Sequence, residues 1–213
     1  MKYYSTNHKS GDVTLREAVV RGLAPDRGLY MPERLNKLSK EFFDNIDKMT
    51  FQEMSFEVAK AFFAEDIPAD DLKRIVYDTL AFETPVVKVD DNIYSLELFH
   101  GPTLAFKDVG ARFMARLLGY FNKEEKQLVN VLVATSGDTG SAVANGFLGV
   151  EGVHVYVLYP KGKVSPIQEC QFTTLGRNIT AVEVDGVFDD CQALVKNAFM
   201  DAELNQRMKL TSA

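Results

Sequence analysis

Cysteine is scarce in this 213-residue sequence: only Cys170 and Cys191 are present, and no CxxC pair occurs. Two thiols in a chain of this size are typical of a reducing compartment and exclude a disulfide-rich framework. Long apolar runs are lacking too. No segment approaches the roughly 18 apolar residues of a membrane-spanning helix, and the start, Met1–Ser5, has no apolar core of a secretory leader. We therefore expect a soluble, cytoplasmic protein with no membrane partner.

Positive charge and histidine are also in short supply. Acidic residues number 30 against 24 lysines and arginines, and a net charge of −6 with a pI near 5.2 argues against a nucleic-acid partner. The histidines, His8, His100 and His154, show no metal-ligand spacing with one another or with the cysteines, so no metal site is expected. Neither a Walker loop nor a GxGxxG motif occurs.

Helical patterns dominate the first part of the chain. Thr14 with Glu17, and Thr50 with Glu53, have the spacing of capping boxes at helix starts, and Pro68 precedes a further helix. Behind these signals, apolar residues recur at helical spacing: Leu15, Ala18 and Val19; Phe51, Met54, Val58, Ala61 and Phe62; and Leu72, Ile75, Val76 and Leu80. We predict a mainly helical N-terminal domain over residues 1–85, with a short strand at Tyr3–Thr6 and a turn over Asp26–Pro32.

The periodicity changes after Pro85. Val86–Val89 and Ile93–Leu96 have the composition of strands joined by a short turn, which predicts a hairpin. Strands and helices alternate from there on: β-branched runs at Val129–Ala134, Val153–Tyr159 and Ile179–Val184, with helices at Ala111–Phe121, Thr139–Leu148, Ser165–Leu175 and from Phe188. In the helix over Ser165–Leu175, Ser165 is the expected N-cap and Pro166 the first helical residue. This order predicts a parallel sheet, and hence a small α/β, Rossmann-like domain over residues 86–213. Because a further strand is predicted to begin at Met208–Thr211, just before the sequence stops, we expect a piece of a longer protein.

Lys107 is the first candidate for chemistry. It directly follows the apolar residues Leu104–Phe106, which come after a Gly-Pro turn. Most lysines are solvated surface charges, and that is the simpler interpretation. An apolar setting, however, favours the neutral amine, a nucleophile that forms Schiff bases with carbonyl compounds. The neighbouring Asp108 is interpreted as a structural acid at a helix start.

A second candidate site, with the sequence TSGDTG, spans residues 135–140, directly after a predicted strand. Hydroxyls and successive N–H groups at a helix start bind carboxylate or phosphate, and ligands usually lie at the carboxyl ends of parallel strands. The simpler alternative is a capped strand-to-helix turn. Nearby, His100 is interpreted as part of a turn, and Lys161 and Lys163 as parts of a solvated loop.

The two motifs, in this order and spacing, resemble the fold-type II family of pyridoxal-phosphate enzymes. Four segments sharpen the resemblance to the threonine synthase family of bacteria and fungi: Glu97–Asp108, Ala134–Ala142, Tyr159–Glu169 and Val182–Leu194. The likeness runs through essentially the whole chain. It implies these roles: Lys107 as the catalytic, Schiff-base lysine; Asp138 beside the cofactor ring; and Thr135, Ser136, Gly137 and Thr139 around the substrate carboxylate. Asp138 stands where most of the wider family has asparagine.

The resemblance implies a reaction in which O-phospho-L-homoserine and water give L-threonine and phosphate, with pyridoxal 5'-phosphate as cofactor and Lys107 as general base. The family's glycine-rich cradle for the cofactor phosphate lies beyond residue 213, so the chain by itself is expected to be an incomplete, inactive part of the fold. Two alternatives stay open. A serine/threonine dehydratase would carry asparagine at position 138, and a phosphate-sensing homologue would have no need of Lys107. The oligomeric state is not predicted.

Overall fold

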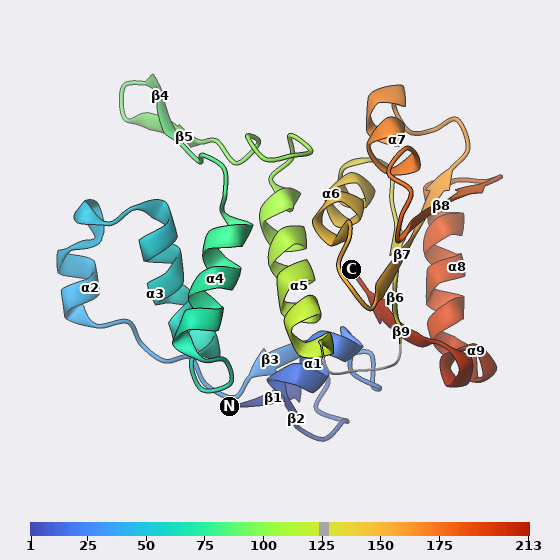
Figure 1. Cartoon of the computed structure of the whole chain (residues 1–213), viewed down its shortest axis with the longest axis horizontal. Helices are drawn as coiled ribbons and strands as arrows, with labels where there is room; N and C mark the ends of the chain where they lie inside the picture. The colour runs from blue at the N-terminus through green and yellow to red at the C-terminus, as the bar shows by residue number, and fades with distance from the viewer. Residues whose placement is uncertain (124–127) are drawn as a thin grey trace. The chain divides into compact units, whose positions relative to one another are not determined.

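A computed structural model describes residues 1–123 and 128–213 of the chain. The chain separates into two compact units, residues 1–84 and residues 85–213 (Figure 1). In the part of the chain that the structure describes, no helix is long and apolar enough to cross a membrane.

The first unit opens with a small antiparallel sheet. Strand β1 (Lys2–Ser5) lies between β2 (Val13–Thr14) and β3 (Tyr30–Pro32). The sequence predicted β1 but assigned all of Asp26–Pro32 to a turn, which is wrong for its last three residues. Those residues pair with β1, a partner 25 to 29 positions away in the chain. Local turn signals do not reveal such a pairing.

The helices of the first unit begin largely where their caps predict. They are α1 (Leu15–Arg21), α2 (Lys40–Asp44), the short 3-10 helix η1 (Ile46–Lys48), α3 (Phe51–Phe63) and α4 (Ala69–Thr79). Both predicted capping boxes are formed, at Thr14 and at Thr50. The stripe of α4 is buried as predicted, at Leu72, Ile75, Val76 and Leu80. The stripe of α3 is only partly buried, because Phe51 and Val58 are exposed.

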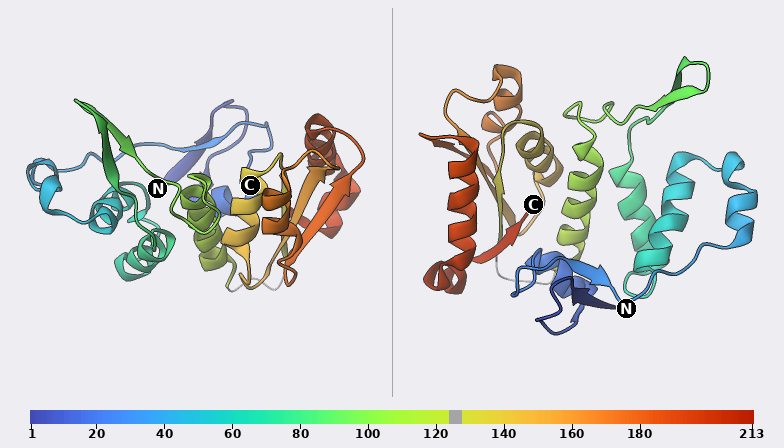
Figure 2. Two further views of the ribbon diagram at one scale, coloured as in Figure 1. Left: turned by 90° about the horizontal axis from the view of Figure 1, so that it is seen from above. Right: turned by 180° about the vertical axis from the view of Figure 1, so that it is seen from behind.

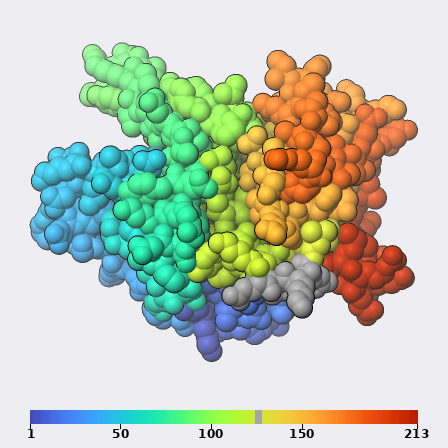
Figure 3. All heavy atoms as spheres, in the orientation of Figure 1, coloured from blue at the N-terminus to red at the C-terminus, as the bar shows by residue number. Residues whose placement is uncertain are grey.

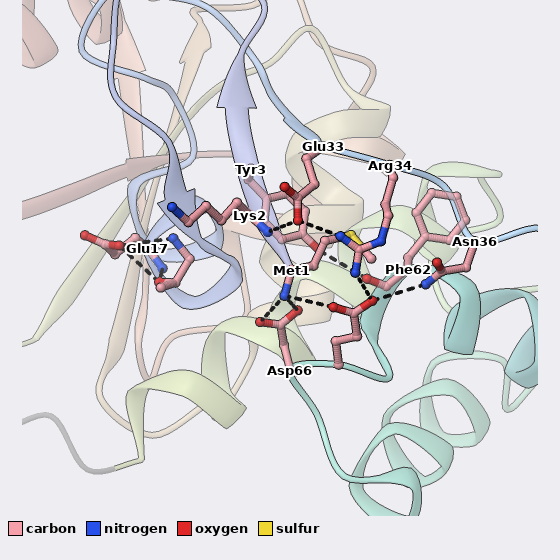
Figure 4. Close-up of polar contacts among 11 residues, drawn as sticks. Met1, Lys2, Tyr3, Glu17, Glu33, Arg34, Asn36, Phe62 and Asp66 are labelled. Carbon is pink, nitrogen blue, oxygen red and sulfur yellow. Dashed lines mark hydrogen bonds and ion pairs between the residues drawn. The ribbon is translucent and has the colours of Figure 1, made fainter.

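Polar contacts join the start of the chain to the end of α3 and the residues that follow it (Figure 4). The α-ammonium group of Met1 lies 3.4 Å from a carboxylate oxygen of Glu65 and 3.4 Å from one of Asp66. The Tyr3 hydroxyl donates to the carbonyl of Phe62 at 3.1 Å. Burial, together with the nearby carboxylates of Asp66 and Glu65, raises the pKa of Tyr3 to about 12.

The second unit begins with the predicted hairpin and continues as the predicted parallel sheet. The hairpin consists of β4 (Val86–Asp90) and β5 (Ile93–Leu96), and it stands clear of the other elements of its unit (Figure 3). The sheet has the order β8-β7-β6-β9, and all of its strands are parallel. Its strands are β6 (Val129–Ala134), β7 (Val153–Pro160), β8 (Ile179–Val184) and β9 (Lys209–Ser212).

Helices cover both faces of this sheet. The helices of the second unit are α5 (Lys107–Asn122), α6 (Asp138–Phe147), α7 (Pro166–Thr173), α8 (Phe188–Met200) and α9 (Ala202–Arg207). Helix α6 packs on one face and α8 on the other, while α5 packs against α6 (Figures 1 and 2). The valines that alternate along the two central strands, Val131 and Val133 with Val155 and Val157, are at most 1% exposed. Because alternate residues of a strand point to the same face of a sheet, these valines share one fully buried face.

Candidate functional site

A buried carboxylate holds the lysine turn in shape. Asp108 is fully buried and accepts hydrogen bonds from the backbone N–H of Thr103 at 2.9 Å and from its hydroxyl at 2.7 Å. Gly101 lies so close that a Cβ there would be 2.5 Å from the same carboxylate. Between them, Leu104 adopts φ 59°, which is uncommon for a residue other than glycine. Asp108 therefore has a structural role, as the sequence predicted.

This anchored turn decides where α5 begins. The sequence predicted a helix over Ala111–Phe121, but the helix begins one turn earlier, at Lys107. The lysine is thus the first residue of a long helix and is held by its backbone. Its side chain is half-buried.

The hydroxyl of Thr135 organises the second candidate segment from inside. Thr135 is 1% exposed, and its Oγ1 accepts from the N–H groups of Gly137 and Gly140 at 2.9 and 2.8 Å. The same hydroxyl donates to the carbonyl of Gly137 at 3.1 Å. All three of these hydrogen bonds lie within the loop. Thr135 therefore shapes the loop and holds the neighbouring residues in place. Ser136 and Asp138 are exposed, and Thr139 is half-buried.

The two candidate segments meet. Lys107 Nζ donates to Thr139 Oγ1 at 2.5 Å, although the residues are 32 positions apart. Beside this contact lies a cavity of about 540 Å³, whose wall includes the apolar side chains of Leu98, Phe106 and Met114. An amine and a hydroxyl on an otherwise apolar wall suit a small molecule that has both an aromatic and a polar part.

Helix α7 adds residues that the sequence analysis did not select. Its start has the predicted form, with Ser165 as N-cap and Pro166 in the first turn. Gln168 Nε2 donates to Asp138 Oδ1, and Gln171 Nε2 donates to the carbonyl of Thr103 at 3.4 Å. The sequence signal at Gln168 was its place three residues after a capping serine, which by itself indicates only a helix start.

The other candidates make contacts elsewhere. His100 is exposed, with its ring nitrogen 2.8 Å from a carboxylate oxygen of Glu97. Lys161 lies 3.6 Å from Glu183. His154 is half-buried within β7 and hydrogen-bonds Thr180 of the neighbouring strand. Within residues 1–123 and 128–213, no cluster of histidine, cysteine and acidic side chains forms a potential metal site.

Structural comparison identifies the class. The chain matches the crystal structure of threonine synthase from Escherichia coli with a TM-score of 0.90 and 45% sequence identity, covering 100% of this chain and 49% of that one. It matches the X-ray structure of PLP-bound threonine synthase from Brucella melitensis with a TM-score of 0.92 and 37% identity, covering 100% and 47%. The chain therefore has the fold of the fold-type II class of pyridoxal-phosphate enzymes.

Sequence comparison shows similarity to threonine synthases. Residues 2–80 match the family model described as threonine synthase N terminus. Threonine synthase from Haemophilus influenzae is 46% identical over 213 residues, which are 100% of this chain and 49% of that protein. The chain is thus similar along its whole length to threonine synthases. It spans about half the length of the curated relatives that it matches.

Proposed function

We propose that the protein carrying this sequence is a threonine synthase, a lyase that converts O-phospho-L-homoserine and water to L-threonine and phosphate. The observation that supports this most directly is the contact between Lys107 Nζ and Thr139 Oγ1. It puts an amine suited to a carbonyl cofactor beside a loop suited to an anionic substrate. The relatives described above favour this function over that of a serine/threonine dehydratase.

The residues present fit pyridoxal 5'-phosphate. Lys107 supplies the amine for the aldehyde of the cofactor, and the apolar wall formed by Leu98, Phe106 and Met114 suits an aromatic ring. Asp138 is the residue that we propose to contact the ring. When bound, the cofactor withdraws electrons from the substrate carbon that loses a proton.

The loop over residues 135–140 would bind the substrate carboxylate. Ser136 and Thr139 offer hydroxyls, and the backbone N–H groups at the start of α6 favour an anion. Gly137 has φ 149°, a conformation that a side chain would strain. Thr135 holds these groups in place. The amine of Lys107 lies within reach of the same loop. When it is not bonded to the cofactor, it is suited to take up and return the substrate proton.

The unpaired state of Cys170 and Cys191 supports a reducing compartment, and we place the protein in the cytoplasm. Its proposed partner is a small-molecule substrate.

The cofactor assignment is tested by chemical labelling. The protein is incubated with pyridoxal phosphate, reduced with borohydride and mapped by peptide mass spectrometry. We expect the label on Lys107, and we expect it to be absent from Lys107→Arg, which keeps the charge but not the reactive amine. The exposed Lys161 and Lys163 serve as internal comparisons. Equal labelling of all three lysines would contradict a specific site.

The reaction is tested by phosphate release from O-phospho-L-homoserine, using the protein at its natural length. Lys107→Arg should lower kcat by more than about a hundredfold, because general acid–base catalysis alone contributes about 10²–10⁴. Lys161→Arg, an exposed change outside the proposed site, is the matched control. Turnover by Lys107→Arg at the rate of the unchanged protein would refute the proposed function.

A further inference from the structure

Gln168 uses its side chain differently from its counterparts in other helices. In α1 and α3, the third helical residue is a glutamate, Glu17 or Glu53, whose carboxylate accepts from the backbone N–H of the capping threonine. Gln168 occupies the same position in α7, but its amide N–H donates to Asp138 in the candidate loop. The side chain therefore links α7 to the start of α6.

Ser165 determines which end of the Gln168 amide faces the loop. Its hydroxyl donates to Gln168 Oε1 at 2.9 Å and accepts from the backbone N–H of Gln168 at 3.4 Å. Because the amide oxygen is already engaged, the NH₂ group is directed to the carboxylate of Asp138. Glutamine suits this position because one side chain must both accept from a hydroxyl and donate to a carboxylate.

Gln168 also packs against the loop backbone. A Cβ built on Gly137 would lie 2.6 Å from Gln168 Oε1, so the amide group occupies the space beside this glycine. Ser141 Oγ donates to the Gln168 carbonyl at 3.3 Å. Gln168 thus contacts residues 137, 138 and 141, on both sides of Thr139 in the sequence. Thr139 is the residue that accepts the hydrogen bond from Lys107.

We propose that Gln168 is a positioning residue of this site. It holds the Asp138 carboxylate and the Gly137 backbone so that the hydroxyls of Ser136 and Thr139 keep the orientation needed for an anionic substrate. Its effect on substrate binding rests on the proposed function, whereas its effect on the loop does not.

The pairing is tested by exchanging the donor and the acceptor. Gln168→Glu places a carboxylate against Asp138, and Asp138→Asn with Gln168→Glu restores one donor and one acceptor. Glutamate three residues after a capping serine favours a helix start, so a loss in Gln168→Glu will not come from failure of α7. Gln168→Met keeps the length of the side chain without its hydrogen bonds. Gln206→Met, at an exposed position of α9, is the matched control.

Hydrogen exchange of the loop amides is the first measurement. We expect exchange at residues 136–139 to be about tenfold faster in Gln168→Glu and Gln168→Met, since each loses a hydrogen bond to a charged group. The double variant should return towards the rate of the unchanged protein. Equal exchange in all variants, or a double variant as fast as Gln168→Glu, would overturn the pairing.

Steady-state kinetics is the second measurement. Gln168→Met should raise KM for O-phospho-L-homoserine about tenfold with little change in kcat, and labelling of Lys107 by pyridoxal phosphate should be unaffected. An unchanged KM would overturn the positioning role, even if exchange were faster. If Lys107 is not labelled in the unchanged protein, the proposed function fails, and the exchange results still decide whether Gln168 holds the loop.

Discussion

At the scale of single residues, Thr135 shows how a buried hydroxyl shapes an exposed loop. Its one hydroxyl oxygen accepts hydrogen bonds from the backbone N–H groups of both Gly137 and Gly140. The side chain of Thr135 also fills the space in front of Gly140, where a Cβ would clash with the Thr135 methyl group. Both polar and apolar parts of the residue are therefore used.

Thr135→Val should destabilise the protein by about 2 kcal/mol or more. The change keeps the shape of the side chain but leaves two buried N–H groups unpaired, each at a cost of about 1–3 kcal/mol. Thr135→Ser, which retains the hydroxyl, should recover most of the loss. Denaturant unfolding gives the comparison. A valine variant as stable as the serine variant would show that the hydroxyl does not hold the loop.

Tyr3 couples the stability of the first unit to alkaline pH. Its pKa is raised from about 10 to about 12 in the folded protein, chiefly by burial and then by Asp66 and Glu65. Folding therefore favours the neutral phenol. The resulting stabilisation is complete below the unfolded pKa of about 10, and it is lost as the pH rises through the folded pKa of about 12.

Tyr3→Phe should reduce the fall in stability between pH 10 and 12. At neutral pH the variant should be less stable by about 0.5–1.5 kcal/mol, because the hydrogen bond to the Phe62 carbonyl is lost. Thermal unfolding measured from neutral pH to pH 12 tests both effects. Tyr94→Phe is the control, since that side chain is exposed. A steep alkaline loss that persists in Tyr3→Phe would assign the effect to another group.

At the scale of elements, local capping signals are strong where both partners are close in sequence. The Thr50 hydroxyl accepts from the Glu53 backbone N–H at 3.2 Å, and the Glu53 carboxylate accepts from the Thr50 N–H at 2.8 Å. These bonds satisfy groups at the start of α3 that have no partner within the helix. They also lower the pKa of Glu53, mainly through the hydrogen bond to the Thr50 backbone.

Thr50→Ala should cost about 1 kcal/mol through loss of this cap. Thr50→Ser should be nearly neutral, because it keeps the oxygen. Ser55→Ala, within the same helix, controls for the gain in helix propensity that alanine brings. Urea unfolding followed by circular dichroism measures all three. If Thr50→Ala and Ser55→Ala had the same effect, the cap would contribute nothing to stability.

At the scale of the whole molecule, each compact unit has its own buried residues, and the candidate site lies entirely within residues 85–213. Lys107, Thr139 and Gln168 all belong to this unit, together with the four-stranded parallel sheet. The functional division into domains 1–85 and 86–213 stays a prediction, because compactness does not demonstrate independent folding.

We predict that residues 85–213 expressed alone will fold cooperatively. Their sheet and its covering helices supply a core of buried valines, and no strand of the sheet comes from the first unit. Far-UV circular dichroism and a single cooperative unfolding transition test this prediction. A separate unit that lacks a cooperative transition would show that the first unit is required for folding.

The sequence by itself determined those features that depend on residues a few positions apart. Capping boxes at Thr14 and Thr50, the cap at Ser165 and the valine-rich strands all appear where their local patterns predict. The reason is physical: a cap joins residues three positions apart, and a buried sheet face needs apolar residues at every second position of a strand. The same patterns did not predict α2, η1 or α9, which are short and have weak apolar periodicity.

Only the tertiary structure decided which distant groups meet. Pairing of β3 with β1, burial of Asp108 beneath the lysine turn, and the bond from Gln168 to Asp138 join residues that no local period relates. Lys107 and Thr139 were both candidates from the sequence, and their roles stay proposals. Their contact arises because α5 packs against α6 while Asp108 fixes the start of α5. A sequence pattern identifies such side chains one at a time. Packing of the helices brings them within hydrogen-bonding distance.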